Sequence, residues 1–188
     1  MLKEQVINQV IAREKGYVND PADLGGETNW GITVSVARAY GYTGPMRDLP
    51  RQVAENVYAD LYWNVLRLDA VAAISPEIAA EVADTAVNMG VGIAGKFLQR
   101  ALNAFNDSGR LWPDMEVDGL VGPRTIGALH AYATHRSGQG RPLMLAVMLA
   151  ALNAQQGSRY IDLSEARDAN ERFTFGWFAH RVVPPALA

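Results

Sequence analysis

The sequence predicts a mainly α-helical protein with one small β element near residues 17–32. Apolar residues recur at helical spacing along most of the chain, and Val6, Ile7, Val10 and Ile11 form the first such stripe. Few segments show the apolar–polar alternation of a half-buried strand. With 188 residues, 49% of them hydrophobic, the chain is long enough to bury a full core.

The expected elements follow one another at clear start and stop signals. The first helix should end near Gly16, and residues 17–32, rich in Asn, Asp, Pro and Gly, should form a loop with a short hairpin. Proline is well tolerated in the first turn of a helix, because the amide that it lacks would have no partner there. Asp48, followed by Leu49 and Pro50, is expected to be the N-cap of a further helix. Other helices are expected at Ser75-Pro76, after the glycines at 90, 92 and 95, at Gly122-Pro123, at Pro142 and from about Ala169 to His180.

These elements divide into an N-terminal lobe, residues 1–90, and a C-terminal helical lobe, residues 91–188, which we expect to form one compact domain. Residues 1–94 hold 7 basic and 12 acidic side chains, whereas residues 95–188 hold 10 and 8. This distribution gives no basic stripe of the kind that tracks a phosphate backbone, so we expect no nucleic-acid partner.

Composition also excludes several kinds of site. The chain has no cysteine, which excludes disulfides and thiolate metal sites. Its three histidines form no close pair beside an acidic cluster, so we expect neither a metal nor an organic cofactor. No segment approaches the roughly 20 apolar residues that span a bilayer, which argues against stable membrane insertion. The N-terminus lacks the pattern of a signal peptide, so synthesis in a cytoplasm is expected.

Glu14 is the residue that the sequence singles out. It continues the buried stripe of the first helix and lies in its last turn, where the helix dipole disfavours a negative charge. Desolvation and the dipole should both raise its pKa. A carboxyl group that stays protonated near neutral pH can act as a general acid. The structural alternative is that Glu14 pairs with a nearby Arg or Lys.

The residues of the loop that follows Glu14 support the hypothesis that Glu14 is a catalytic acid. It carries Asp20 and Asp23, a hydroxyl at Thr28, and the aromatic rings of Tyr17 and Trp30. Carboxylates arranged around a sugar, together with aromatic rings that lie against it, are the minimum required for glycoside hydrolysis. Tyr17, Asp20 and Trp30 are therefore candidate substrate-binding residues.

At these positions the sequence resembles the N-acetylmuramidases of glycoside hydrolase family 108, which are typically bacteriophage endolysins and related lysozymes. The resemblance rests on Glu14-Lys15-Gly16-Tyr17, Asn19, Pro21, Asp23, Gly25-Gly26, Thr28, Gly31-Ile32-Thr33, Tyr62-Trp63, the segment 84–90 and the turn 118–125. The family usually has glycine where this chain has Lys15. Adjacent helical residues do not face each other, so we expect Lys15 to point to solvent.

The resemblance implies a lysozyme-like fold and an enzyme that hydrolyses the β-1,4 bond between N-acetylmuramic acid and N-acetylglucosamine. It implies that Glu14 is the catalytic acid and that Asp23 and Thr28 position the attacking water. Peptidoglycan glycan strands would be the partner, with the protein acting as a monomer on the cell wall after holin-type release or secretion.

Two further sites have competing interpretations. Asp84 and Asn88 share one helix face, where they could contact the glycan, or Asn88 could cap the helix end at Gly90. The turn Asp118–Thr125 is similar to a peptidoglycan-binding repeat, but a glycine turn that feeds a proline-started helix is also a structural device.

Two other functions remain open from the sequence. A lytic transglycosylase would need Glu14 but neither Asp23 nor Thr28. A non-catalytic wall-binding protein would keep the fold and use none of these groups.

Overall fold

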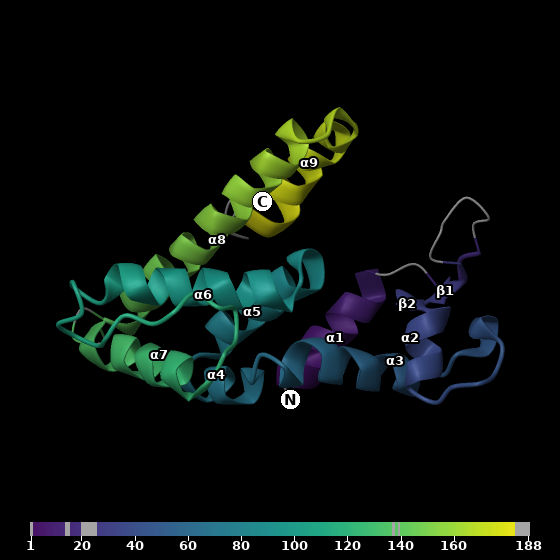
Figure 1. The fold of residues 1–188 in the computed structure, drawn as a ribbon, viewed down its shortest axis with the longest axis horizontal. Coiled ribbons are helices and arrows are strands. Elements are labelled where there is room, and N and C mark those ends of the chain that lie inside the picture. The colour runs from purple at the N-terminus through teal and green to yellow at the C-terminus, as the bar shows by residue number, and fades with distance from the viewer. Residues whose placement is uncertain (1, 14–15, 20–25, 137, 139, 183–188) are drawn as a thin grey trace. The chain divides into compact units, whose positions relative to one another are not determined.

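The computed structural model describes residues 2–13, 16–19, 26–136, 138 and 140–182. Its Cα positions cluster into two compact units, Met1–Val91 (unit 1) and Gly92–Ala188 (unit 2). Figure 1 shows that helices dominate both units and that the only paired strands drawn belong to a small hairpin in unit 1. The expectation of a mainly α, lysozyme-like fold with a small β element after the first helix is confirmed.

Unit 1 runs from the first helix to the helix that starts at Pro76. Its elements are α1 (Leu2–Arg13), β1 (Thr28–Asn29), β2 (Ile32–Thr33), α2 (Val34–Ala39), the 3-10 turn η1 (Met46–Asp48), α3 (Arg51–Tyr58), the π-helical turn η2 (Ala59–Asn64), α4 (Leu68–Ile74) and α5 (Pro76–Met89).

The core of unit 1 joins α1 to the hairpin. Ile7, Val10 and Ile11 of α1 are at most 7% exposed, as their helical spacing predicts, and Ile32 of β2 lies in the same apolar cluster at 4%. Burying a side chain of this size contributes about 1.5–3 kcal/mol. The end of α1 and the hairpin are therefore held by a single core.

Helix starts follow most of the sequence signals. One helix was expected after the glycines at 90, 92 and 95, but α6 (Val91–Phe105) begins before the last two of these glycines, which lie inside it. Ser75 caps α5 as expected, since its hydroxyl accepts from the Ile78 amide at 3.3 Å. Asp48 was expected to cap the third helix, and that expectation is wrong. It ends the 3-10 turn η1, and Pro50, whose extended backbone precedes α3, is the capping residue with no side-chain bond.

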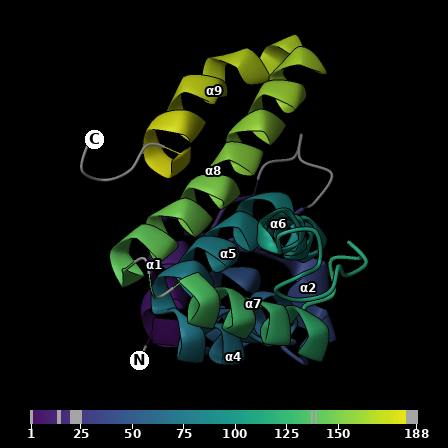
Figure 2. The ribbon, with the colours of Figure 1, turned by 90° about the vertical axis from the view of Figure 1, so that its left-hand side faces the viewer.

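In its described residues, unit 2 has three long helices, one short helix and two short helical turns. Its elements are α6 (Val91–Phe105), α7 (Pro123–Arg136), α8 (Arg141–Glu165), the 3-10 turn η4 (Asp168–Asn170), α9 (Glu171–Trp177) and the π-helical turn η5 (Phe178–Val182). Figures 1 and 2 show α9 folded back along α8. The last expected helix thus begins two residues late and ends in a π turn. No helix in the described part of the chain is long and apolar enough to cross a bilayer.

A buried glutamine fixes the turn at Asp118 against α6. Gln99 is 2% exposed; its Nε2 donates to the Asp118 carboxylate at 2.7 Å, and its Oε1 accepts from the Gly119 amide at 2.8 Å. The Gln99 hydrogen bond, and a second one from the Leu120 amide, lower the pKa of Asp118. Within unit 2 this turn thus has a structural role.

The turn at Asp118 approaches α6 so closely that a single methyl group added to α6 should be destabilising. A Cβ at Gly95 would lie 2.1 Å from the Gly119 carbonyl oxygen, a backbone atom. Gly95→Ala should therefore destabilise unit 2 by about 3 kcal/mol or more in chemical unfolding. Gly127→Ala in α7 is the control, because its Cβ would meet nothing within 4 Å, and it should stabilise by up to about 1 kcal/mol. Equal stability of the two variants would contradict the close approach.

Candidate active site

A short hairpin carries Thr28 and Trp30. Thr28 pairs with Thr33 and Asn29 with Ile32, and the Val18 backbone exchanges two 2.9 Å hydrogen bonds with Thr28. The two turn residues, Trp30 and Gly31, both have positive φ, at 54° and 75°. A two-residue loop with two positive φ values matches the twist of the flanking strands.

Asn29 anchors this hairpin to the rest of unit 1. It is only 4% exposed, and its Nδ2 donates to the carbonyl oxygens of Met46 and Arg47 at 2.8 and 3.2 Å. Asn29 is not among the residues that the sequence singles out. Its position directly before the Trp30-Gly31 turn is the one local feature that marks it. A polar side chain next to a turn usually faces solvent, so this position does not reveal that Asn29 is buried.

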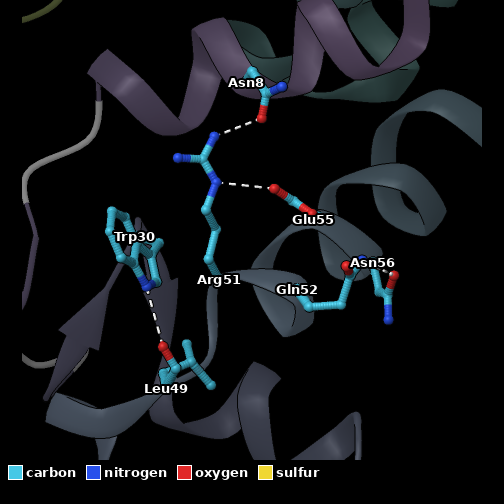
Figure 3. A network of polar contacts seen from close by, with 7 residues as sticks. All are labelled: Asn8, Trp30, Leu49, Arg51, Gln52, Glu55 and Asn56. Carbon is cyan, nitrogen blue, oxygen red and sulfur yellow. Dashed lines mark hydrogen bonds and ion pairs between the residues drawn. The ribbon is translucent and has the colours of Figure 1, made fainter. Parts of the chain in front are cut away.

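Trp30 is held in a conformation that a bulky residue rarely adopts. Positive φ at such a residue costs on the order of 1–3 kcal/mol. Two hydrogen bonds offset this cost: Trp30 Nε1 donates to the Leu49 carbonyl oxygen, and the Tyr58 hydroxyl donates to the Trp30 carbonyl oxygen, both at 3.1 Å. Nε1 is therefore already engaged within the protein (Figure 3).

Tyr17 lies against a cation. The guanidinium carbon of Arg47 is 5.0 Å from the centre of the Tyr17 ring, and the ring packs beside the core of unit 1. The Arg47 backbone also accepts from Asn29. Tyr17 is therefore tied to the segment that anchors the hairpin.

A polar groove lies between α1 and α3. Arg51 bridges its two sides, because its Nε donates to Glu55 Oε1 at 2.9 Å and its Nη2 donates to Asn8 Oδ1 at 2.5 Å (Figure 3). Gln52 donates to Asn56 Oδ1 at 3.1 Å on the next turn of α3. The groove has a volume of about 540 Å³ and is lined by Lys3, Glu4, Ile7, Asn8, Gln52, Glu55, Asn56 and Ala59.

Asp84 and Asn88 contact each other on α5. Asn88 Nδ2 donates to the Asp84 carbonyl oxygen at 2.6 Å and to its Oδ2 at 3.1 Å. This bond stays inside α5, so the Asn88 side chain does not cap the helix end at Gly90. The neighbouring Val87 packs on the core that α1 and the hairpin share.

Three of the candidate residues, Glu14, Asp20 and Asp23, lie outside the described residues. Thr28 is described: its backbone is fully paired in the hairpin, and its hydroxyl has no hydrogen-bond partner among the described residues. The same part of the chain contains no group of three or more acidic or histidine side chains that could hold a metal ion.

Each of the two units matches a known protein family. Residues 7–90 match the family described as "Glycosyl hydrolase 108". The N-terminal unit belongs to glycosyl hydrolase family 108. Residues 93–182 match the family described as "Predicted Peptidoglycan domain". The chain is therefore a glycoside hydrolase that degrades peptidoglycan.

A solved structure supports the fold of the whole chain. It is similar to the structure of Brucella abortus SagA, with a TM-score of 0.54 and 21% sequence identity over 98% of this chain and 97% of that one. A search of curated proteins found no significant match.

The Asn29 anchor makes a testable prediction for the enzyme. Asn29→Ala removes the only side chain seen to donate to the Met46 and Arg47 carbonyl oxygens in the described residues. It should cost about 1–3 kcal/mol in unfolding free energy and lower kcat, because Thr28 and Trp30 lose their support. Asn56→Ala on the exposed face of α3 is the matched stability control and should change the unfolding free energy by less than about 0.5 kcal/mol. An Asn29→Ala protein as stable as this control would refute the anchor.

Proposed function

We propose that this protein is an N-acetylmuramidase that hydrolyses the β-1,4 bond between N-acetylmuramic acid and N-acetylglucosamine. The observation that carries the proposal is the core shared by α1 and the hairpin. Ile11 lies three residues before Glu14, Ile32 lies four residues after Thr28, and both are buried in one apolar cluster. A rigid core is what a catalytic constellation needs to keep its groups in register.

In the proposed reaction, Glu14 protonates the leaving glycosidic oxygen. Asp23 accepts a hydrogen bond from a water molecule on the opposite side of the sugar ring, and the Thr28 hydroxyl orients that water toward the anomeric carbon. As the water attacks, its proton passes to Asp23 and the C–O bond breaks. Direct attack by water inverts the anomeric configuration, and inverting enzymes separate their two carboxyl groups by about 6.5–9.5 Å.

The hairpin gives the other residues of the site supporting roles. Trp30 offers a ring for stacking but no free N–H, so it would position a sugar without orienting its hydroxyls. Tyr17, whose ring lies against Arg47, is at the start of the same loop. Asp20 lies between Tyr17 and Trp30 in the sequence. We propose that Tyr17, Asp20 and Trp30 bind the glycan, with Asp84 and Asn88 at its edge, and that the enzyme works as a monomer on the cell wall after release or secretion.

Replacing the proposed acid tests the reaction. Glu14→Gln removes the transferable proton but keeps the shape of the side chain, so it should lower the hydrolysis of purified peptidoglycan by at least about a hundredfold. Glu27→Gln makes the same chemical change on the hairpin side of the loop and should leave activity within about twofold. Mass spectrometry of the wild-type products should find reducing N-acetylmuramic acid ends. Anhydro ends would show a transglycosylase, and binding without any product would show a wall-binding protein.

The water-positioning pair makes a separate prediction. Asp23→Asn and Thr28→Val should each lower kcat by about ten- to a thousandfold with little change in KM, because water is positioned for attack and contributes little to ground-state binding. Thr28→Ser keeps the hydroxyl and should retain most of the activity. If Asp23→Asn and Thr28→Val both cleaved peptidoglycan at the wild-type rate, direct attack by a held water would be excluded.

A further inference from the structure

Unit 2 contains a basic groove between α6 and α8 that none of the proposed catalytic steps uses. The two helices meet where Gln155 Nε2 donates to the Phe97 carbonyl oxygen at 3.0 Å. The groove has a volume of about 560 Å³. Every residue that lines it belongs to unit 2.

Three cations face this groove. Lys96 and Arg100 lie one helical turn apart on α6, and Arg159 lies on α8. Like charges four residues apart on a helix destabilise it slightly. The stability of α6 therefore gives no reason to place Lys96 and Arg100 on the same face. Asp162 is the one acidic side chain that lines the groove. The lining therefore has a formal net charge of +2, within a chain whose net charge is −3.

The cations of this groove are available for a ligand. Arg100 and Arg159 form no hydrogen bond or ion pair with any other described residue. Lys96 likewise has no such bond in the described part of the chain, although its charge helps to lower the pKa of Asp118. By contrast, Arg110 of the same unit pairs with Asp107 at 2.6 Å, so unit 2 does pair other cations.

The floor of the groove supplies two further kinds of contact. Phe97 is 7% exposed, and Ile93 lies beside it on the same face of α6. Gln155 Oε1 is buried with no hydrogen-bond partner among the described residues. A buried carbonyl oxygen without a donor is costly, and a ligand N–H that reached it after a small shift of the Gln155 side chain would remove that cost. The groove thus combines cations, an apolar floor, one amide acceptor and one carboxylate.

We propose that this groove binds the stem peptide of peptidoglycan. In peptidoglycan the glycan strand is neutral where its lactyl groups are amide-linked to peptide, so the negative charges lie on the stem peptides. Their carboxylates fit Lys96, Arg100 and Arg159, and alanine methyl groups fit the floor at Ile93 and Phe97. A backbone N–H of the peptide can donate to Gln155, and a side-chain amine can pair with Asp162.

This inference rests on peptidoglycan being the substrate, and it adds a site that recognises the peptide and not the glycan. Carboxylate recognition by arginine is strong because each charge-assisted hydrogen bond is about twice as strong as a neutral one. The groove would therefore hold the enzyme on cross-linked wall that carries peptides, independently of the cleavage step.

The test measures binding in a protein that cannot cut. In a Glu14→Gln background, the full chain carrying Arg100→Gln and Arg159→Gln is compared with one carrying Arg167→Gln and Arg172→Gln. The second pair removes the same charge from exposed positions of unit 2 outside the groove. Both proteins are sedimented with intact peptidoglycan and with glycan strands from which an amidase has removed the peptides.

The groove variant should bind intact peptidoglycan at least about tenfold more weakly, while the control stays within about twofold. Binding to the peptide-free strands should be the same for both proteins, and titration with a free stem peptide should show the same difference between the two variants. Thermal unfolding checks that both fold, and Arg159→Lys alone should keep most of the binding.

Three outcomes would overturn the proposal. An equal loss in the control pair would show a general charge effect, and a loss on peptide-free strands would place the glycan in the groove. Binding of both proteins to vesicles of phosphatidylglycerol and to inorganic phosphate is measured as well. If the groove variant lost binding to these two probes but not to peptidoglycan, phosphate would be the ligand. Because the catalytic acid is already replaced, none of these results depends on whether the proposed hydrolysis is correct.

Discussion

The arrangement of the candidate active site depends on the burial of one amide side chain. Asn29 lies almost entirely inside unit 1, where its Nδ2 is the donor for two carbonyl oxygens of the η1 segment. A buried amide in this position is stable only while both partners are in place. The hairpin is therefore fixed relative to η1, and Thr28 and Trp30 take their positions from it.

Backbone strain and hydrogen bonding compensate each other at the hairpin turn. Trp30 occupies a left-handed conformation that glycine would adopt freely. Its indole N–H and its carbonyl oxygen are both bonded, to Leu49 and Tyr58. The surrounding structure thus over-determines a costly conformation, a pattern that is common at functional sites. In the proposed role of Trp30 as a glycan-binding residue, a ring already held in place would lower the entropy lost on binding.

Unit 2 uses its side chains in two different ways. Around Gln99 the polar groups satisfy one another, and the backbones at Gly95 and Gly119 approach so closely that no side chain fits. Between α6 and α8 the cations have no partner of their own among the described residues. The motif at Asp118–Thr125 that resembles a peptidoglycan-binding repeat has a structural role in unit 2, whereas the proposed ligand groove lies where the sequence shows no motif.

The sequence by itself determined the fold class, the apolar stripe of α1, the helix starts at Ser75-Pro76 and Gly122-Pro123, and the family, since these depend on local spacing and on short motifs. It also selected Thr28 and Trp30 as candidates. It did not select Asn29 or Arg51, and it placed a helix cap at Asp48 where the chain forms a 3-10 turn. Only the tertiary structure brought Asn8 to Arg51 across 43 positions, and Gln155 to Phe97 across 58. Such contacts depend on how helices pack. Helix packing is set by the whole core, and no local pattern of residues encodes it.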